Sequence, residues 1–240
     1  MDKWEIQIDE KLPKLQFTFS LFGTGCAPRG DIIAIKAKSK NGKTFLASIF
    51  ASVILGTRFG DLKTEVPARL AKVLYFDTEQ NKVNTQALMV RIHRLCRWDM
   101  KNNRKLHVYS LREMPQEERM EYIKERVREH RPVAVFIDGI GDLTPDFNDI
   151  AYSQDTIQDL MSMSSMNDCA VFFILHTNKN DTNMKGHLGT LATQKCSDIF
   201  YVERDNSGTF HVSETDSRNK TIAKFQFIVD ETGIPIYRKT

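Results

Sequence analysis

The sequence predicts an α/β protein in which a mostly parallel central sheet is flanked by helices and continued by antiparallel strands near the C-terminus. Between residues 32 and 175, short unbroken apolar runs alternate with longer stretches of helical periodicity. Unbroken apolar runs are what strands covered by helices on both faces require, so a parallel sheet is indicated. After residue 199 the helical stretches stop, and short strand-like pieces separated by glycine-containing turns take their place.

The chain has 240 residues, which is enough for one large domain with a single core. Hydrophobic residues make up 41% and charged residues 27%, as in ordinary folded proteins rather than disordered ones. No repeat or linker divides the sequence. We therefore expect one domain over residues 1–240, with an N-terminal hairpin or cap at 1–30 and antiparallel edge strands at 199–240.

Charge, cysteines and hydropathy exclude several classes of protein. A net charge of +3 permits contact with nucleic acid but does not by itself indicate it. The four cysteines lie far apart without a C-x-x-C pair, which favours reduced thiols over a zinc site. No apolar run is long enough to span a bilayer, and the N-terminus has acids where a signal peptide needs bases. We expect a cytoplasmic protein with no membrane partner.

The expected elements follow one another along the chain. Alternating apolar residues from Leu15 to Leu21 predict the N-terminal hairpin. Core strands are predicted at 32–35, 73–76, 133–137 and 171–175. Helices are predicted at 45–56, 82–97, 116–130 and 153–166, of which 82–97 is rich in basic residues. The C-terminal strands are predicted at 199–203, 209–213, 223–229 and 235–238.

The strongest motif follows the first core strand and precedes the first helix. It fits the phosphate-loop pattern A-x-x-x-x-G-K-T and consists of Ala37, Lys38, Ser39, Lys40, Asn41, Gly42, Lys43 and Thr44. Such a loop turns its backbone N–H groups toward a triphosphate, while the next helix points its positive end at the same anion. The alternative is a solvated basic turn, and the strand-loop-helix context favours the phosphate loop.

Each residue type in this loop has a chemical task. Gly42 permits close approach of the backbone to the ligand, and Lys43 is expected to reach the β- and γ-phosphates of ATP. Thr44 is expected to offer its hydroxyl to Mg²⁺. Ala37 replaces the usual first glycine, which is a small departure because it adds one methyl group.

Acidic residues close two of the core strands. Asp138 follows the apolar run 133–137 and is predicted to hold Mg²⁺, as in a Walker B strand. Glu79, shortly after the run 73–76, is the candidate base for the attacking water, with Asp77 as the second choice. The alternative for these acids is a structural one, in which they cap a helix or a loop.

Polar residues also follow the fourth core strand. His176 stands directly after the apolar run 171–175, where its side chain is expected near the γ-phosphate and can sense its loss. A structural histidine is the alternative, and the position after the strand carries the prediction.

In these motifs and their order the chain resembles the RecA-like P-loop ATPases, especially the RepA and DnaB-type hexameric helicase branch and related mobilization ATPases of mobile elements. The resemblance covers nearly the whole chain. Its anchors are Arg29-Gly30, the phosphate loop, and the segments at 77–79, 137–139, 175–179 and 185–189.

The resemblance implies ATP and Mg²⁺ as cofactors and a homo-oligomer, either a hexameric ring or a filament. It also implies that the loops at 142–153 and 178–188 face a channel and touch DNA. The second loop is the better candidate, with Lys179, Lys185 and His187, because the first loop is acidic. A cation supplied to the neighbouring subunit is implied near the late strands, with Arg218 as the candidate and Lys220 as its companion.

Two accounts of function remain open from the sequence. The first is a DNA-associated ATPase, a motor or helicase of RepA type in plasmid or transposon replication or mobilisation. The second is a nucleotide-dependent switch or loader that acts on a protein partner without translocating on DNA. A small-molecule kinase is a weaker third account, since no acceptor-site motif is evident.

Overall fold

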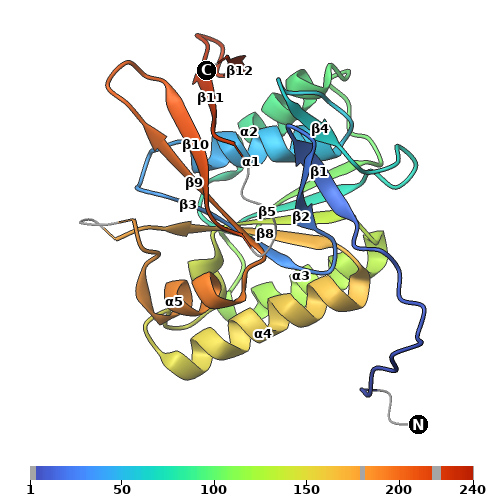
Figure 1. Ribbon diagram of the computed structural model, residues 1–240. Coiled ribbons are helices and arrows are strands. Elements are labelled where there is room, and N and C mark those ends of the chain that lie inside the picture. The colour runs from blue at the N-terminus through green and yellow to red at the C-terminus, as the bar shows by residue number, and fades with distance from the viewer. Residues whose placement is uncertain (1–3, 179–181, 218–222, 240) are drawn as a thin grey trace.

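The computed structural model describes residues 4–178, 182–217 and 223–239, and it contains two sheets and two layers of helices (Figure 1). The larger sheet has nine strands in the order β12-β11-β10-β9-β3-β8-β7-β5-β6. The smaller sheet has three strands in the order β2-β1-β4. The strand order places β3, which leads into the phosphate loop, in the middle of the larger sheet.

Six consecutive strands of the large sheet are parallel, and three are antiparallel. The parallel strands are β3 (Ile32–Ala37), β5 (Val73–Asp77), β6 (Leu106–Ser110), β7 (Ala134–Asp138), β8 (Ala170–His176) and β9 (Asp198–Arg204). The antiparallel strands are β10 (Phe210–Ser217), β11 (Phe225–Val229) and β12 (Pro235–Arg238). The predicted fold class is confirmed, but its boundary at 199 was wrong, because β9 pairs in parallel with β3 and the antiparallel part begins with β10.

Helices cover both faces of the large sheet, as the unbroken apolar strands require. The helices α1 (Lys43–Ile54) and α2 (Lys82–Cys96) lie on one face together with the small sheet, and the opposite face carries α3 (Gln116–His130), α4 (Ile150–Asn167) and α5 (Gly186–Lys195) (Figure 1). Each layer has its own buried cluster. Alternate residues of one strand serve the two clusters, as Ile33 and Ile35 face one side and Ile32 and Ala34 the other.

The N-terminal hairpin is present and is completed by a third strand. β1 (Phe17–Leu21) and β2 (Thr24–Pro28) pair in antiparallel fashion, and β4 (Leu62–Thr64) pairs with the other edge of β1. The backbone N–H of Ala27 donates to a carboxylate oxygen of Asp198 over 2.5 Å, which ties the hairpin to β9. β4 has only three residues, too few for a periodicity to appear in the sequence.

Two further elements, β6 and α5, were not predicted from the sequence, and each has a physical reason. β6 lies at the edge of the large sheet, so most of its side chains are half-buried and the apolar run is interrupted. α5 begins at Gly186, inside the segment that was predicted to be a loop through residue 188. A short 3-10 helix, η1 (Ile140–Leu143), follows β7.

The cysteines and hydropathy agree with the expectations from composition. All four cysteines are free thiols. Burial raises the pKa of Cys96 to about 11 and that of Cys169 to about 12, which leaves both protonated and unreactive at neutral pH. No helix among the described residues is long and apolar enough to cross a membrane.

Candidate nucleotide-binding site

The phosphate loop lies where the sequence places it, between the end of β3 and the start of α1. Gly42 is the N-cap of α1 and has a φ of 90°, in the left-handed region that favours glycine. A Cβ atom there would also come within 2.5 Å of the Phe210 ring. Among the described residues, no side chain caps α1 and no acid occupies its first turn. The N–H groups of that turn are therefore suited to an anion.

Lys43 points into the site rather than into solvent. Its residue exposure is 7%, and its ammonium nitrogen lies 3.2 Å from the carbonyl oxygen of Lys38 and 3.1 Å from Nδ1 of His176. Burial lowers the pKa of Lys43, and the carboxylates of Asp138 and Glu79 oppose that change. A buried cation with few counter-charges stabilises an added phosphate strongly, because the local dielectric is low.

Asp138 and Thr44 meet at the carboxyl end of β7. The Thr44 hydroxyl donates to Oδ2 of Asp138 over 3.0 Å, and the hydroxyl of Tyr75 donates to the same oxygen over 2.9 Å. Burial raises the pKa of Asp138 to about 6, against the opposing effect of the Tyr75 hydrogen bond. Two hydroxyl groups thus hold the Asp138 carboxyl group in place.

The donors at this point fit Mg²⁺. A hydroxyl and a carboxylate are hard oxygen ligands, and Mg²⁺ is commonly held by one or two protein groups together with water and substrate phosphates. Within the described residues, no group of three or more His, Cys, Asp or Glu side chains could hold a metal alone. Thr44 and Asp138 would therefore supply the protein ligands, with phosphate and water completing the coordination sphere.

His176 stands between Lys43 and Glu79. Because the Lys43 ammonium can only donate, Nδ1 of His176 must accept, and the ring proton then lies on Nε2. That Nε2 is 3.7 Å from Oε1 of Glu79. The hydrogen bond from His176 lowers the pKa of Glu79, partly opposed by burial, so the Glu79 carboxylate is ionised at neutral pH. A Cβ on Gly139 would lie 3.0 Å from Oε1 of Glu79, so the glycine makes room for that carboxylate.

Asp77 has a structural role. It is fully buried, and its oxygens accept hydrogen bonds from the backbone N–H groups of Glu79 and Gln80, from the Gln80 amide, and from the Thr85 hydroxyl. With its lone pairs occupied in this way, Asp77 fixes the turn between β5 and α2. That arrangement leaves Glu79 as the carboxylate after β5 that faces the phosphate loop.

The structure adds two positioning residues that the sequence analysis missed. Tyr75 is completely buried in β5, and its hydroxyl donates a hydrogen bond to Asp138. The Thr78 hydroxyl accepts from the Gly139 N–H over 2.9 Å and lies 2.8 Å from a carboxylate oxygen of Asp142, which joins the ends of β5 and β7. The sequence could have indicated the role of Tyr75, because a tyrosine inside an apolar strand is expected to be buried and a buried phenol needs a hydrogen-bond partner. No sequence pattern indicated the role of Thr78.

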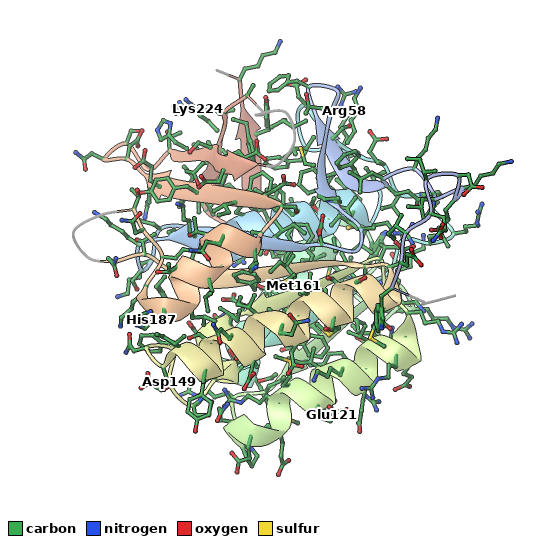
Figure 2. The ribbon with its side chains drawn as sticks, turned by 60° about the horizontal axis from the view of Figure 1, so that its bottom comes forward. Arg58, Glu121, Asp149, Met161, His187 and Lys224 are labelled. Carbon is green, nitrogen blue, oxygen red and sulfur yellow. The ribbon has the colours of Figure 1, made fainter. Side chains whose placement is uncertain are left out.

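The segment after β8 connects the site to α5. The backbone N–H of Lys185 donates to the carbonyl of His176 over 3.0 Å, and the Lys185 ammonium lies 4.9 Å from the centre of the Phe147 ring. Lys185 is exposed at the N-cap of α5, and His187 is exposed in its first turn. Figure 2 shows His187 on the same side of the molecule as Asp149, the N-cap of α4. The predicted sites Lys179, Arg218 and Lys220 lie outside the described residues.

A cavity of about 220 Å³ joins the ends of β7 and β8 to this segment. It runs from Glu79 and His176 past Asp142 to Phe147 and Lys185. The candidate base, the candidate sensor and the start of α5 thus line one space.

A parallel sheet with a lysine-bearing phosphate loop after its central strand, and an acid at the end of a neighbouring strand, defines a P-loop nucleotide-binding protein. A family model described as an AAA domain matches residues 15–182, which is more than half of the chain. The chain therefore belongs to the AAA domain family.

A solved structure has a similar fold. The KaiC-like protein PH0186 from the hyperthermophilic archaeon Pyrococcus horikoshii OT3 aligns with a TM-score of 0.63 over 90% of this chain and 92% of its own, at 10% identity. At that identity the match shows the fold alone, which is the RecA-like fold predicted from the motifs. A comparison with curated proteins gave no match. The chain is thus an AAA-domain protein with a RecA-like fold, and neither of these two names mentions DNA or a helicase.

Proposed function

We propose that this protein binds ATP with Mg²⁺ and hydrolyses it at the carboxyl edge of β3, β5, β7 and β8. The observation that carries the proposal is the convergence of Lys43, Thr44, Asp138, Glu79 and His176 from four separate segments onto the phosphate loop. A basic surface turn would not bring two carboxylates and a histidine to its lysine.

Each group has one step in the proposed reaction. Lys43 and the N–H groups of α1 stabilise the charge on the β- and γ-phosphates, and Thr44 and Asp138 hold the metal. Mg²⁺, when bound, supplies positive charge to the β- and γ-oxygens. Glu79 accepts a proton from a water molecule while the oxygen of that water forms a bond to the γ-phosphorus. The bond between the γ-phosphorus and the oxygen of the ADP leaving group breaks in the same step. The products are ADP and inorganic phosphate.

His176 is the proposed sensor of the γ-phosphate. Its ring contacts Lys43 and faces Glu79, and its carbonyl accepts from Lys185 at the start of α5. A phosphate that draws the Lys43 ammonium away from Nδ1 changes the position of His176, and the backbone bond transmits that change to α5.

The finer proposal is a DNA-associated motor of RepA type in plasmid or transposon replication or mobilisation. It rests on the order of the motifs and on the exposed Lys185 and His187 beside the sensor. Arg218, with Lys220 as its companion, is proposed to complete the site of a neighbouring subunit in a ring or filament. Lys179 is proposed as a further DNA contact.

One observation favours the second account, a switch that acts on a protein partner. The neighbouring segment presents Asp146 and Asp149 to solvent, together with the exposed apolar side chains of Ile150 and Tyr152. Acids repel DNA phosphates, and a mixed acidic and apolar surface suits a protein.

ATP turnover measured with and without single-stranded DNA at low salt, alongside the particle mass from light scattering, tests these proposals. Stimulation by DNA in a ring-sized particle supports the motor. Slow turnover that is indifferent to DNA in a small particle supports the switch. Absence of turnover under both conditions contradicts ATP hydrolysis itself.

A further inference from the structure

The loop between α2 and β6, residues 97–105, carries a local positive charge that the nucleotide site does not use. It holds Arg97, Lys101, Arg104 and Lys105 against one acid, Asp99. Four cations and one anion in nine residues give a charge of +3, which equals the net charge of the whole chain. The charges of all the other residues therefore sum to zero.

These cations are available to a ligand. All four are exposed, and within the described chain none of them forms an ion pair with a carboxylate. Strand register adds one more cation at the same edge of the sheet. Val73 pairs with Leu106, which places Lys72 beside Lys105, although the Lys72 ammonium already donates to the carbonyl of His130 over 2.8 Å.

The loop also contains an aromatic side chain and forms a surface pocket. Trp98 is half-buried, packs in part against the core, and lines a pocket of about 620 Å³ together with the four cations, Asp99, Asn102 and Asn103. An indole among Arg, Lys and Asn side chains offers stacking to a base and charge to its phosphates, a combination that recurs where proteins bind single strands. A duplex keeps its bases inside its own stack and cannot use the indole in this way.

The loop is held in shape by its own hydrogen bonds. Nδ1 of His93 lies 2.9 Å from the carbonyl oxygen of Asp99, and the His93 ring is perpendicular to Trp98 at 5.5 Å. Oδ1 of Asn103 accepts from the backbone N–H groups of Lys105 and Leu106. A pocket preformed in this way loses less entropy when it binds a ligand.

From these observations we infer that the 97–105 loop is a binding site for single-stranded nucleic acid, with Trp98 stacking on a base and Arg97, Lys101, Arg104 and Lys105 contacting phosphates. The loop leads into the amino end of β6, whereas the phosphate loop lies at the carboxyl edge of the same sheet. The site is thus separate from the nucleotide and from the proposed DNA contacts at 178–188, and it does not require ATP hydrolysis.

The tryptophan content of the chain makes the test direct. The chain has two tryptophans, Trp4 and Trp98, so in a Trp4→Phe protein the indole fluorescence reports on the loop alone. The probes are a dT oligonucleotide and an abasic oligonucleotide of equal length, titrated without ATP. We expect the dT strand to quench Trp98, and the abasic strand to bind about tenfold more weakly with little quenching.

Salt and charge variants supply the second readout. Four phosphate contacts to a single strand predict a fall in affinity of about fifty-fold between 50 and 200 mM salt. Lys101→Ala with Arg104→Ala removes two contacts and should reduce that fall to about sevenfold. The matched control, Lys224→Ala with Lys239→Ala, removes two exposed charges elsewhere and should leave binding unchanged.

Several results would overturn the inference. These are equal binding by the loop variant and its control, quenching that is the same for dT and abasic strands, binding of anionic vesicles without binding of the oligonucleotide, or no binding at 50 mM salt. A Lys43→Ala protein should bind dT normally, so a failure of the nucleotide site and a failure of this site give different patterns.

Discussion

At the scale of single residues, the site depends on a division of labour between two acids that look alike in the sequence. Asp77 ends β5 and Glu79 follows it two residues later, but Asp77 is buried and accepts hydrogen bonds on both oxygens, whereas the Glu79 side chain is 45% exposed beside His176. Only Glu79 can face a water molecule on the nucleotide. The sequence left the choice between them open because burial of a side chain after a strand depends on the neighbouring strand.

Glu79→Gln should therefore separate binding from hydrolysis. The amide fills the same space but cannot accept the proton, so we expect nucleotide affinity within about threefold of the original and turnover reduced by about 100-fold or more. Lys43→Ala should instead lose nucleotide affinity, because it removes the charge that faces the phosphates. Turnover with radiolabelled ATP and binding of a fluorescent nucleotide distinguish the two.

The exposed Glu113 provides the matched control for that experiment. It pairs with Lys82 on the surface, and Glu113→Gln makes the same chemical change away from the site. Normal turnover by Glu79→Gln would remove the base role from Glu79 and move the search to a different group.

The buried carboxylate of Asp138 should lower the free energy of unfolding of the protein at neutral pH. Its pKa is raised by burial to about 6, against an ordinary value of 3.8. Between these values the unfolded chain has lost a proton that the folded chain retains, so stability falls as pH rises from about 4 to about 6 and is then level. The full effect above that window is about 3 kcal/mol.

Asp138→Asn should consequently stabilise the protein without ligand at pH 7, by up to about 3 kcal/mol, and abolish turnover that depends on Mg²⁺. Urea denaturation at pH 7 and at pH 4 measures this, and the advantage of the variant should vanish at pH 4. An equal advantage at both values would mean that the gain does not come from the buried charge.

At the scale of elements, β10 supports the phosphate loop by direct packing. The Phe210 ring occupies the space that a side chain at Gly42 would need, stacks on Phe227 at 4.7 Å, and lies 6.0 Å from Phe45 in the first turn of α1. The C-terminal strands, although antiparallel and late in the chain, thus belong to the nucleotide site. The sequence predicts those strands but does not indicate which residues they contact.

Gly42→Ala should reduce nucleotide affinity at least tenfold, because the methyl group meets the Phe210 ring and the residue must keep a positive φ. Calorimetric titration with ATP measures the loss. Gly141→Ala is the control, since open space surrounds that position. Phe210→Ala added to Gly42→Ala removes the clash but not the strain, so it should restore only part of the affinity. Full affinity in the single variant would show that the loop does not need its observed shape.

At the scale of the whole molecule, the contacts of His176 determine how a change in the bound nucleotide can alter a distant surface. His176 is in contact with Lys43 at one end and, through its carbonyl, with the start of α5 at the other. α5 packs against α4, so a change at the γ-phosphate has a short path to the outer helices (Figure 1). This path is required by either account of the function.

DNA and assembly should be linked if the motor account is right. We expect ATP turnover to rise at least fivefold on addition of single-stranded DNA, in a particle of several subunits. Arg218→Ala should abolish turnover, and mixing it with Glu79→Gln should restore activity in part, since each variant supplies what the other lacks. Light scattering with turnover assays measures this. A monomer with full activity would exclude a contribution from a neighbouring subunit.

The residues that bind the phosphates could be read from the sequence because a local segment builds that part of the site. The segment 37–44 sets its own turn through Gly42 and continues directly into α1, so one short pattern specifies strand, loop and helix. The parallel sheet could also be predicted, because apolar runs buried on both faces differ from alternating ones. These features depend on neighbours in the chain.

The tertiary structure alone decided which distant residues complete the site. Tyr75 reaches Asp138, Thr78 joins the ends of β5 and β7, and Phe210 packs on Gly42, across separations of up to 168 residues that no local pattern encodes. The same holds for β9, whose parallel pairing with β3 depends on where α5 returns the chain to the sheet. Hydrogen bonding and packing between remote segments follow from the three-dimensional arrangement of strands, and for that reason the sequence specified the phosphate loop while only the fold showed what surrounds it.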